Sequence, residues 1–255
     1  MSTQKLVALV NVELKKLFRD PMTLAVIVLM PVGLTLIYYL ALGNLYSGWD
    51  PQHPELSHFE YLVPGTMGYA VIYMGMMLAL ALCEYREAGL LKRVGTTPTS
   101  PNVYLGSLLI ANMIIAVFQA LIVLLVSVLL GFHVQAGLPG LVLVVIFMGM
   151  LAITAVGLGL ITATVAKSTG AASGLSMLFI VPMMIFGTFL AVFDETTRAI
   201  AHFTPNYYAT DSLFLIFNGS SLSNGVIWQN LLILTAISLV VVVAGVQLFK
   251  RTEFR

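Results

Sequence analysis

The stretch "PGLVLVVIFMGMLAITAVGLGLITATVA", from Pro139 to Ala166, decides the class of fold because none of its 28 residues carries a charge. At about 1.5 Å per residue, a helix of this length crosses the roughly 30 Å hydrocarbon core of a bilayer. The rest of the chain agrees: 59% of its 255 residues are hydrophobic and 9% are charged. Charged residues make up about a quarter of an ordinary soluble domain. The sequence therefore predicts an integral membrane protein.

Similar uncharged runs recur along the chain. We predict one all-α membrane domain over residues 1–255, with six transmembrane helices at Met22–Leu42, Tyr61–Cys83, Val103–Gly131, Pro139–Ala166, Ala171–Phe193 and Val226–Phe249. A further stretch, Ala199–Phe217, is interrupted by polar residues and a proline. Because unsatisfied backbone is costly in lipid, we expect short re-entrant helices there, within an outer region at 194–225.

The basic residues predict the orientation. Eleven of the twelve Lys and Arg residues fall on one side of the predicted spans, and Arg198 is the exception. The positive-inside rule makes that side cytoplasmic, so we expect a multi-pass protein of the inner (plasma) membrane with both termini in the cytoplasm. A cleavable signal peptide is the alternative for the N-terminus, but the first apolar run is about twice the usual length of such a segment.

Residues 1–20 have the pattern of an amphipathic helix. Apolar residues recur at helical spacing on one face and basic residues on the other, and Asp20-Pro21 ends the pattern. This pattern predicts a helix that lies among the lipid headgroups. A basic anchor that only sets the orientation is a compatible alternative.

The charged segment "EYREAGLLKRVGTTPTSP", Glu84–Pro101, is unusual in so apolar a chain. We expect a helix over Glu84–Gly95, with one face formed by Glu87, Leu90, Leu91 and Val94. Opposite charges are not spaced three or four apart, and Gly89 costs about 1 kcal/mol relative to Ala. Such a short helix is marginal alone, so we predict that a partner protein contacts its leucines and unmatched charges. A solvated loop that only sets the topology is the alternative.

The sequence also argues against several classes of function. The predicted spans contain no Asp, Glu, Lys, Arg or His, which disfavours an ion-coupled carrier or channel, although backbone carbonyls can bind Na⁺. The chain lacks the phosphate-binding GxxxxGK[ST] motif, and Lys167-Ser168 lacks its glycines. We interpret His53 and His58 as solvated loop residues rather than metal ligands. We therefore expect no enzyme activity, cofactor or nucleic-acid binding in this chain, and any uphill transport needs a second protein as its motor.

Three stretches carry a family resemblance: "FEYLVPG" at Phe59–Gly65, the charged segment, and "FTPNYYATDSLF" at Phe203–Phe214. Together they resemble the ABC-2 type permeases, the membrane subunits of a class of ATP-binding-cassette exporters. The chain departs from the family pattern at three places. Leu90 occupies a position where Thr is common, Phe186-Gly187 replaces Ser-Gly, and Leu213-Phe214 follows Asp211 where Arg is frequent.

The resemblance implies that residues 84–101 form a coupling helix and loop, seated in a cleft of a separate cytoplasmic ATPase subunit that binds ATP and Mg. The implied contact residues are Glu84, Arg86, Glu87, Leu90, Leu91, Lys92, Arg93 and Val94, with Lys167 in a second, smaller contact. A second copy of the chain, or a homologous permease, would complete the transporter. The implied translocation path follows the seam between the two copies, past Met67, Tyr69, Tyr73, Met74, Met77, Met177, Phe179, Met183 and Phe186.

We therefore expect the permease subunit of an exporter that moves an amphipathic, drug-like or lipid-like substrate outward. A path rich in methionine and aromatic residues suits such substrates, although each of these residues also fits plain helix packing. Two alternatives remain at this point. One is a permease for polysaccharide or teichoic-acid-type polymers, and the other is a membrane assembly subunit that transports nothing.

Overall fold

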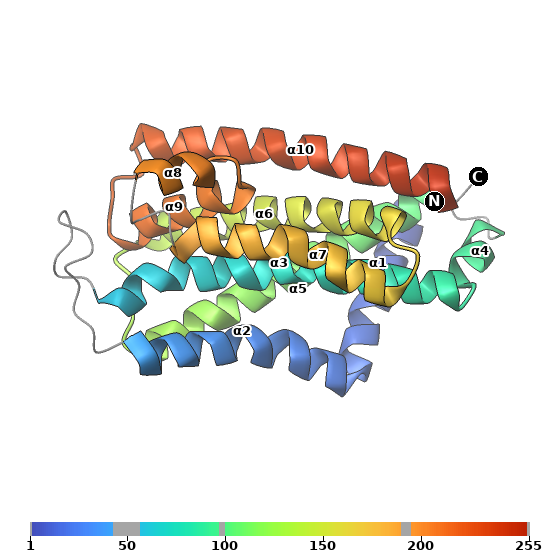
Figure 1. Ribbon diagram of the computed structural model, residues 1–255, viewed down its shortest axis with the longest axis horizontal. Helices are drawn as coiled ribbons and strands as arrows, with labels where there is room; N and C mark the ends of the chain where they lie inside the picture. Colours follow the sequence, from blue (N-terminus) through green and yellow to red (C-terminus); the bar gives the residue numbers. More distant parts are fainter. Residues whose placement is uncertain (1, 43–56, 97–99, 190–194, 254–255) are drawn as a thin grey trace.

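The computed structural model describes residues 2–42, 57–96, 100–189 and 195–253, and this part of the chain forms a bundle of roughly aligned helices (Figure 1). The helices are α1 (Ser2–Arg19), α2 (Pro21–Leu42), α3 (His58–Glu87), α4 (Leu90–Gly95), α5 (Pro101–Leu129), α6 (Leu138–Val165), α7 (Thr169–Met184), the π-helix η1 (Ile185–Phe189), α8 (Glu195–Ala201), α9 (Pro205–Phe217) and α10 (Gly225–Glu253).

Six helices in the described ranges are long and apolar enough to cross a membrane: α2, α3, α5, α6, α7 and α10. The predicted all-α fold with six spans is confirmed, and most bounds differ by only a few residues. The fifth span, predicted to reach Phe193, continues from α7 into η1 and is described as far as Phe189. The short helices expected before the last span are α8 and α9.

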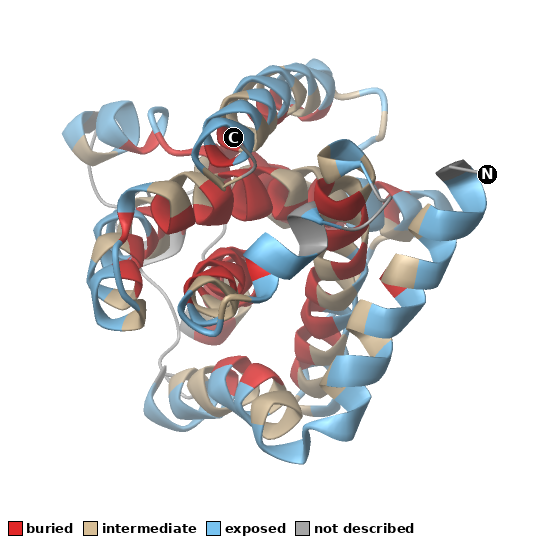
Figure 2. Cartoon of the chain, turned by 90° about the vertical axis from the view of Figure 1, so that its right-hand side faces the viewer, coloured by how far each residue is buried: buried red, intermediate tan, exposed pale blue. Residues whose placement is uncertain are grey.

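The centre of the bundle is α3. Within its most apolar window 83% of the residues are buried, against 17% for α2 and for α10, which lie at the periphery. Figure 2 shows buried residues on the faces that the helices turn toward one another, and exposed residues on the outward faces. The outward faces of the spans are apolar, as helices in contact with lipid require.

Glycines let α6 pack closely against a helix on each side. A Cβ atom on Gly159 would collide with the backbone carbonyl oxygen of Gly75 in α3. One on Gly245 of α10 would lie 2.6 Å from the carbonyl oxygen of Gly157. Because successive residues turn by about 100° around a helix, Gly157 and Gly159 face nearly opposite sides of α6. Small residues at such contacts let helix backbones approach closely in lipid.

The bundle has two distinct ends. One holds both termini and α4, and we call it the inner end; the other holds α8 and α9, and we call it the outer end (Figure 1). The segments expected to share one side of the membrane therefore lie together. That the inner end faces the cytoplasm stays a prediction.

The N-terminal helix α1 packs against α5 and leaves part of its apolar face uncovered. Leu6 lies near Gly106 of α5, and Val10 is buried. Two other apolar side chains of this helix, Val7 and Phe18, are 52% and 70% exposed. The helix thus forms where the pattern predicts it, and its position among lipid headgroups stays a prediction.

Polar side chains from other helices bind backbone carbonyls within two spans, close to a proline in each. Pro31 has no N–H group to bond the carbonyl oxygen of Ile27, and buried Gln119 of α5 donates its Nε2–H to that oxygen. Beyond Pro182, where α7 passes into η1, Asn206 Nδ2 donates to the carbonyl oxygen of Met183 at 3.0 Å. Such bonds allow irregular backbone at membrane depth.

Candidate functional site

The charged segment does not form the single helix expected over Glu84–Gly95. Its first residues, Glu84 to Glu87, are the last turn of α3, and α4 begins at Leu90. Between them Gly89 has a φ of 69°, in the left-handed region that glycine adopts at little cost. A glycine in this conformation commonly ends a helix. The expected single helix was wrong, and Gly89 is the residue that breaks it.

Arg86 connects the inner ends of three spans. Its Nη1 donates to the carbonyl oxygen of Ala166 at 2.7 Å, and its Nη2 donates to that of Ala163 at 2.5 Å. Its Nε lies 2.7 Å from Glu253 Oε1, at the end of α10. The guanidinium therefore binds carbonyls at the C-terminus of α6, where a positive charge also interacts favourably with the helix dipole. The expectation of unmatched charges in the segment is wrong for Arg86, because its partner lies far along the sequence.

Glu87 binds the start of α7, the fifth span. Its Oε1 accepts a hydrogen bond from the backbone N–H of Thr169 at 3.2 Å. Ser168 Oγ accepts another from Ala171 N at 3.2 Å, so both side chains cap the N-terminus of α7. Lys167 lies exposed in this same short α6–α7 loop. The structure therefore brings together the two segments expected to contact an ATPase, through Arg86 and Glu87.

The short helix α4 has one buried face and one exposed face. Leu91 is 2% exposed and packs into the inner core beside Leu82 and Leu108. The expectation that Leu91 packs on a partner is therefore corrected: it anchors α4 to its own chain. Leu90 is 41% exposed.

The charged face of α4 and the last turn of α3 remain accessible. Glu84, Lys92 and Arg93 are exposed, and their side chains make no hydrogen bond or ion pair with any residue that the structure describes. The side chain of Val94 lies outside the described residues. The surface that α4 offers to a partner is therefore Leu90, Lys92 and Arg93, with Glu84 one turn before the break.

The residues expected along the translocation path divide into two groups. Buried inside the chain are Met67, Tyr69, Tyr73, Met74 and Met183, while Met77 and Phe186 are half-buried. On α7, Met177 and Phe179 are 42% and 38% exposed. Neighbouring helices enclose most of these α3 residues, whereas the α7 pair reaches the outer surface of the bundle.

The outer end contains a polar network whose residues were not among the predicted site residues. Asn206 is fully buried, and no described residue donates to its Oδ1. Asn230 Nδ2 donates to Asp211 Oδ2 at 2.8 Å. Burial raises the pKa of the Asp211 carboxyl above its usual value.

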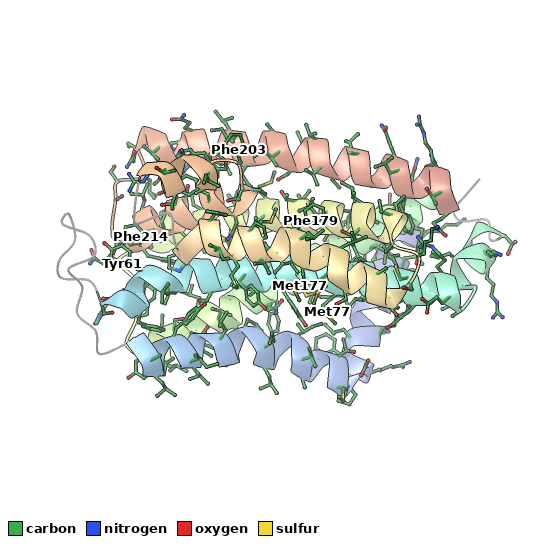
Figure 3. The ribbon with its side chains drawn as sticks, in the orientation of Figure 1. Tyr61, Met77, Met177, Phe179, Phe203 and Phe214 are labelled. Atoms are coloured by element: carbon green, nitrogen blue, oxygen red, sulfur yellow. The ribbon has the colours of Figure 1, made fainter. Side chains whose placement is uncertain are left out.

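Nearby, Tyr61 of α3 stacks on Phe214 of α9 with ring centroids 4.9 Å apart (Figure 3). In the sequence, this region was indicated by the stretch Phe203–Phe214, which carries part of the family resemblance.

The described residues include no group of three or more His, Cys, Asp or Glu side chains close enough together to hold a metal ion. His53 and the side chain of His58 lie outside the described residues.

Comparison with known proteins identifies the class of protein that this bundle belongs to. The family described as ABC-2 type transporter matches residues 4–218. No curated protein matches the sequence at a significant level. The match covers most of the chain, so the chain belongs to the ABC-2 type transporter family, as the resemblance indicated. It is a multi-pass membrane protein, and its membrane domain is the permease subunit of an ABC transporter rather than a catalytic domain.

Proposed function

We propose that this permease is half of an exporter in which a separate cytoplasmic ATPase subunit binds α4 and drives an amphipathic substrate outward. The exposed face of α4 supports this proposal most directly. Leu90, Lys92 and Arg93 project from the inner end, and the described part of the chain supplies no partner for the two charges. A surface that combines one leucine with two cations suits a protein cleft that has an apolar part and an acidic part.

The packing of α4 supports a mechanical role for the contact. Leu91 fixes α4 in the inner core, while Arg86 ties the end of α3 to α6 and α10. Glu87 ties the same end to α7. A displacement of α4 would therefore move the inner ends of four spans together. The ATPase, with its bound ATP and Mg, can shift the permease between two states only if it binds α4 differently in each.

A second copy of the chain, or a homologous permease, would complete the transporter. The described chain supplies six candidate spans, and α7 exposes Met177 and Phe179 on its outward face. Flexible methionine and planar aromatic side chains adapt to amphipathic molecules of different shapes. We assign the protein to the inner (plasma) membrane with the inner end in the cytoplasm, since the termini and most basic residues gather there.

The proposal is tested by purification from the native membrane in mild detergent. An ATPase subunit should co-purify with the wild-type chain, and Lys92→Glu with Arg93→Glu should abolish its recovery. The matched control is Lys250→Glu with Arg251→Glu, which reverses two exposed adjacent cations at the same end of the molecule. The control should retain the ATPase. Recovery of the ATPase with both double variants would refute the role of α4, and absence of any ATPase from the wild type would favour a non-transporting assembly subunit.

A further inference from the structure

A cavity of about 420 Å³ opens at the inner end, between α1, α2, α3 and α5. Its deeper walls are apolar and include Ile27, Met74, Met77, Leu108 and Ile115. Small-molecule sites generally have volumes of about 300–1,000 Å³ and are lined mostly by apolar side chains. The cavity therefore has the size and lining of a ligand site, and it lies within one chain rather than between two copies.

The polar part of the cavity is acidic. Glu13, Asp20 and Glu84 line it with three carboxyl groups, against one ammonium group from Lys16. Lys16 is already paired with Glu13 at 2.8 Å. The carboxylates of Asp20 and Glu84 therefore remain without a cation among the described residues.

Asp20 carries its charge at neutral pH. Hydrogen bonds from the side chain and backbone of Thr23, at 2.6 and 3.2 Å, hold the pKa of the Asp20 carboxyl below its usual value. These bonds also place the carboxylate at the N-terminus of α2, where the chain turns from α1 into the first span. The acidic charge thus lies at the rim of the bundle, next to the apolar walls.

The contacts of Lys16 show that the polar part of the cavity stabilises a cation. Its Nζ lies 3.4 Å from the hydroxyl of Tyr85 and 4.8 Å from the centroid of the Tyr85 ring, within the range of a cation–π contact. Burial lowers the pKa of Lys16, but the contacts with Glu13 and Tyr85 outweigh that effect and raise it overall. A carboxylate and an aromatic face thus already hold one ammonium group at the entrance of an apolar cavity.

We propose that this cavity is a binding site for lipophilic cations, in which Asp20 and Glu84 attract the positive group and the walls around Met74 and Met77 hold the apolar part. The inference deepens the proposed function by naming a class of substrate. Transport of these cations rests on the proposed function, whereas their binding to the cavity does not. Met77 lies between α3 and α2 (Figure 3) and, like Met74, belongs to the residues expected along the translocation path. The site would then receive substrate before it reaches the seam between copies.

Equilibrium binding to the purified chain in neutral detergent tests the site without the ATPase, so its outcome is independent of the coupling role of α4. Radiolabelled tetraphenylphosphonium and tetraphenylborate are similar in size and shape and opposite in charge. The cation should bind saturably and the anion should not. Equal binding of the two ions would show simple partition into apolar surface and would overturn the proposal.

Substitutions then locate the site. Asp20→Asn, which retains a capping side chain, and Glu84→Gln should each weaken cation binding by about threefold to fivefold. Lys16→Met should strengthen it by a similar factor, because it removes the competing ammonium. Glu60→Gln is the control, since it makes the same change on α3 at the outer end and preserves the capping box with Ser57. If Lys16→Met and both carboxylate substitutions leave the affinity for the cation unchanged, the cation binds outside this cavity and the proposal is overturned.

Discussion

Replacing Arg86 by methionine removes the link between α3, α6 and α10 while keeping a long apolar side chain in place. The variant loses two hydrogen bonds to backbone carbonyls and one ion pair. Hydrogen bonds that involve a charged group contribute about 1.5–3 kcal/mol each, and removing one member of a fully buried ion pair costs about 3–5 kcal/mol. The Arg86 side chain is 25% exposed and that of Glu253 11%, so water partly compensates the loss. We expect a cost of about 3 kcal/mol in the stability of the inner end.

The single cysteine of the chain provides the assay. Cys83 is 1% exposed and packs in the inner core one turn before Arg86, so a thiol-reactive fluorophore labels it only when that core opens. A loss of about 3 kcal/mol raises the open population, and with it the labelling rate, roughly 100-fold. Glu253→Met alone should accelerate labelling, and the double variant should cost less than the sum of the two single changes.

The control for this experiment is Lys250→Met, an exposed change one turn before Glu253, which should alter stability by less than about 0.5 kcal/mol. If Arg86→Met labels no faster than this control, the three helices do not depend on the guanidinium. A displacement of α4 would then have no rigid connection through Arg86 to the inner ends of α6 and α10.

Three further predictions follow from other parts of the structure. Gly159→Ala should sharply lower the midpoint of thermal unfolding, because the added methyl group collides with backbone of α3, whereas Gly149→Ala, with open space around its Cβ, should leave it nearly unchanged. Burial raises the pKa of Asp211 in the folded state, so wild-type stability should fall as the pH rises from below 3.8 through the raised value. Asp211→Asn should remove this fall, and parallel melting profiles of the two proteins from acid to neutral pH would contradict it. If the seam between copies lies at α7, Met177→Cys should form disulfide-linked dimers in oxidised membranes, and Val240→Cys on α10 should not. Non-reducing gels measure the dimers, and the reverse result would place the seam at α10.

The transmembrane helices could be predicted from the sequence because the bilayer itself fixes their length and excludes charge. The stretch Pro139–Ala166, for instance, is observed as a helix over Leu138–Val165. The expected all-α class, the short outer helices and the family depend on such local patterns. The break at Gly89 was not predicted, because the sequence does not show that this glycine adopts the left-handed conformation that commonly ends a helix.

The contacts that organise the inner end could not be read in the same way. Arg86 and Glu253 are separated by most of the chain, and only the packing of α3, α6 and α10 brings them together. For the same reason, spacing along one helix could not show that Leu91 points into the core. The acidic cavity likewise combines Asp20 and Glu84 from different elements, so neither local segment shows it alone.

Site-specific photo-crosslinking in the native membrane tests the coupling role of α4 most directly. A photoreactive amino acid replaces Lys92, and mass spectrometry identifies the adducts, with the same replacement at Lys250 as the control. We predict that position 92 crosslinks to a protein with an ATP-binding-cassette fold, and that position 250 does not. Adducts from position 92 that contain no nucleotide-binding protein, in membranes where the transporter is active, would contradict the account.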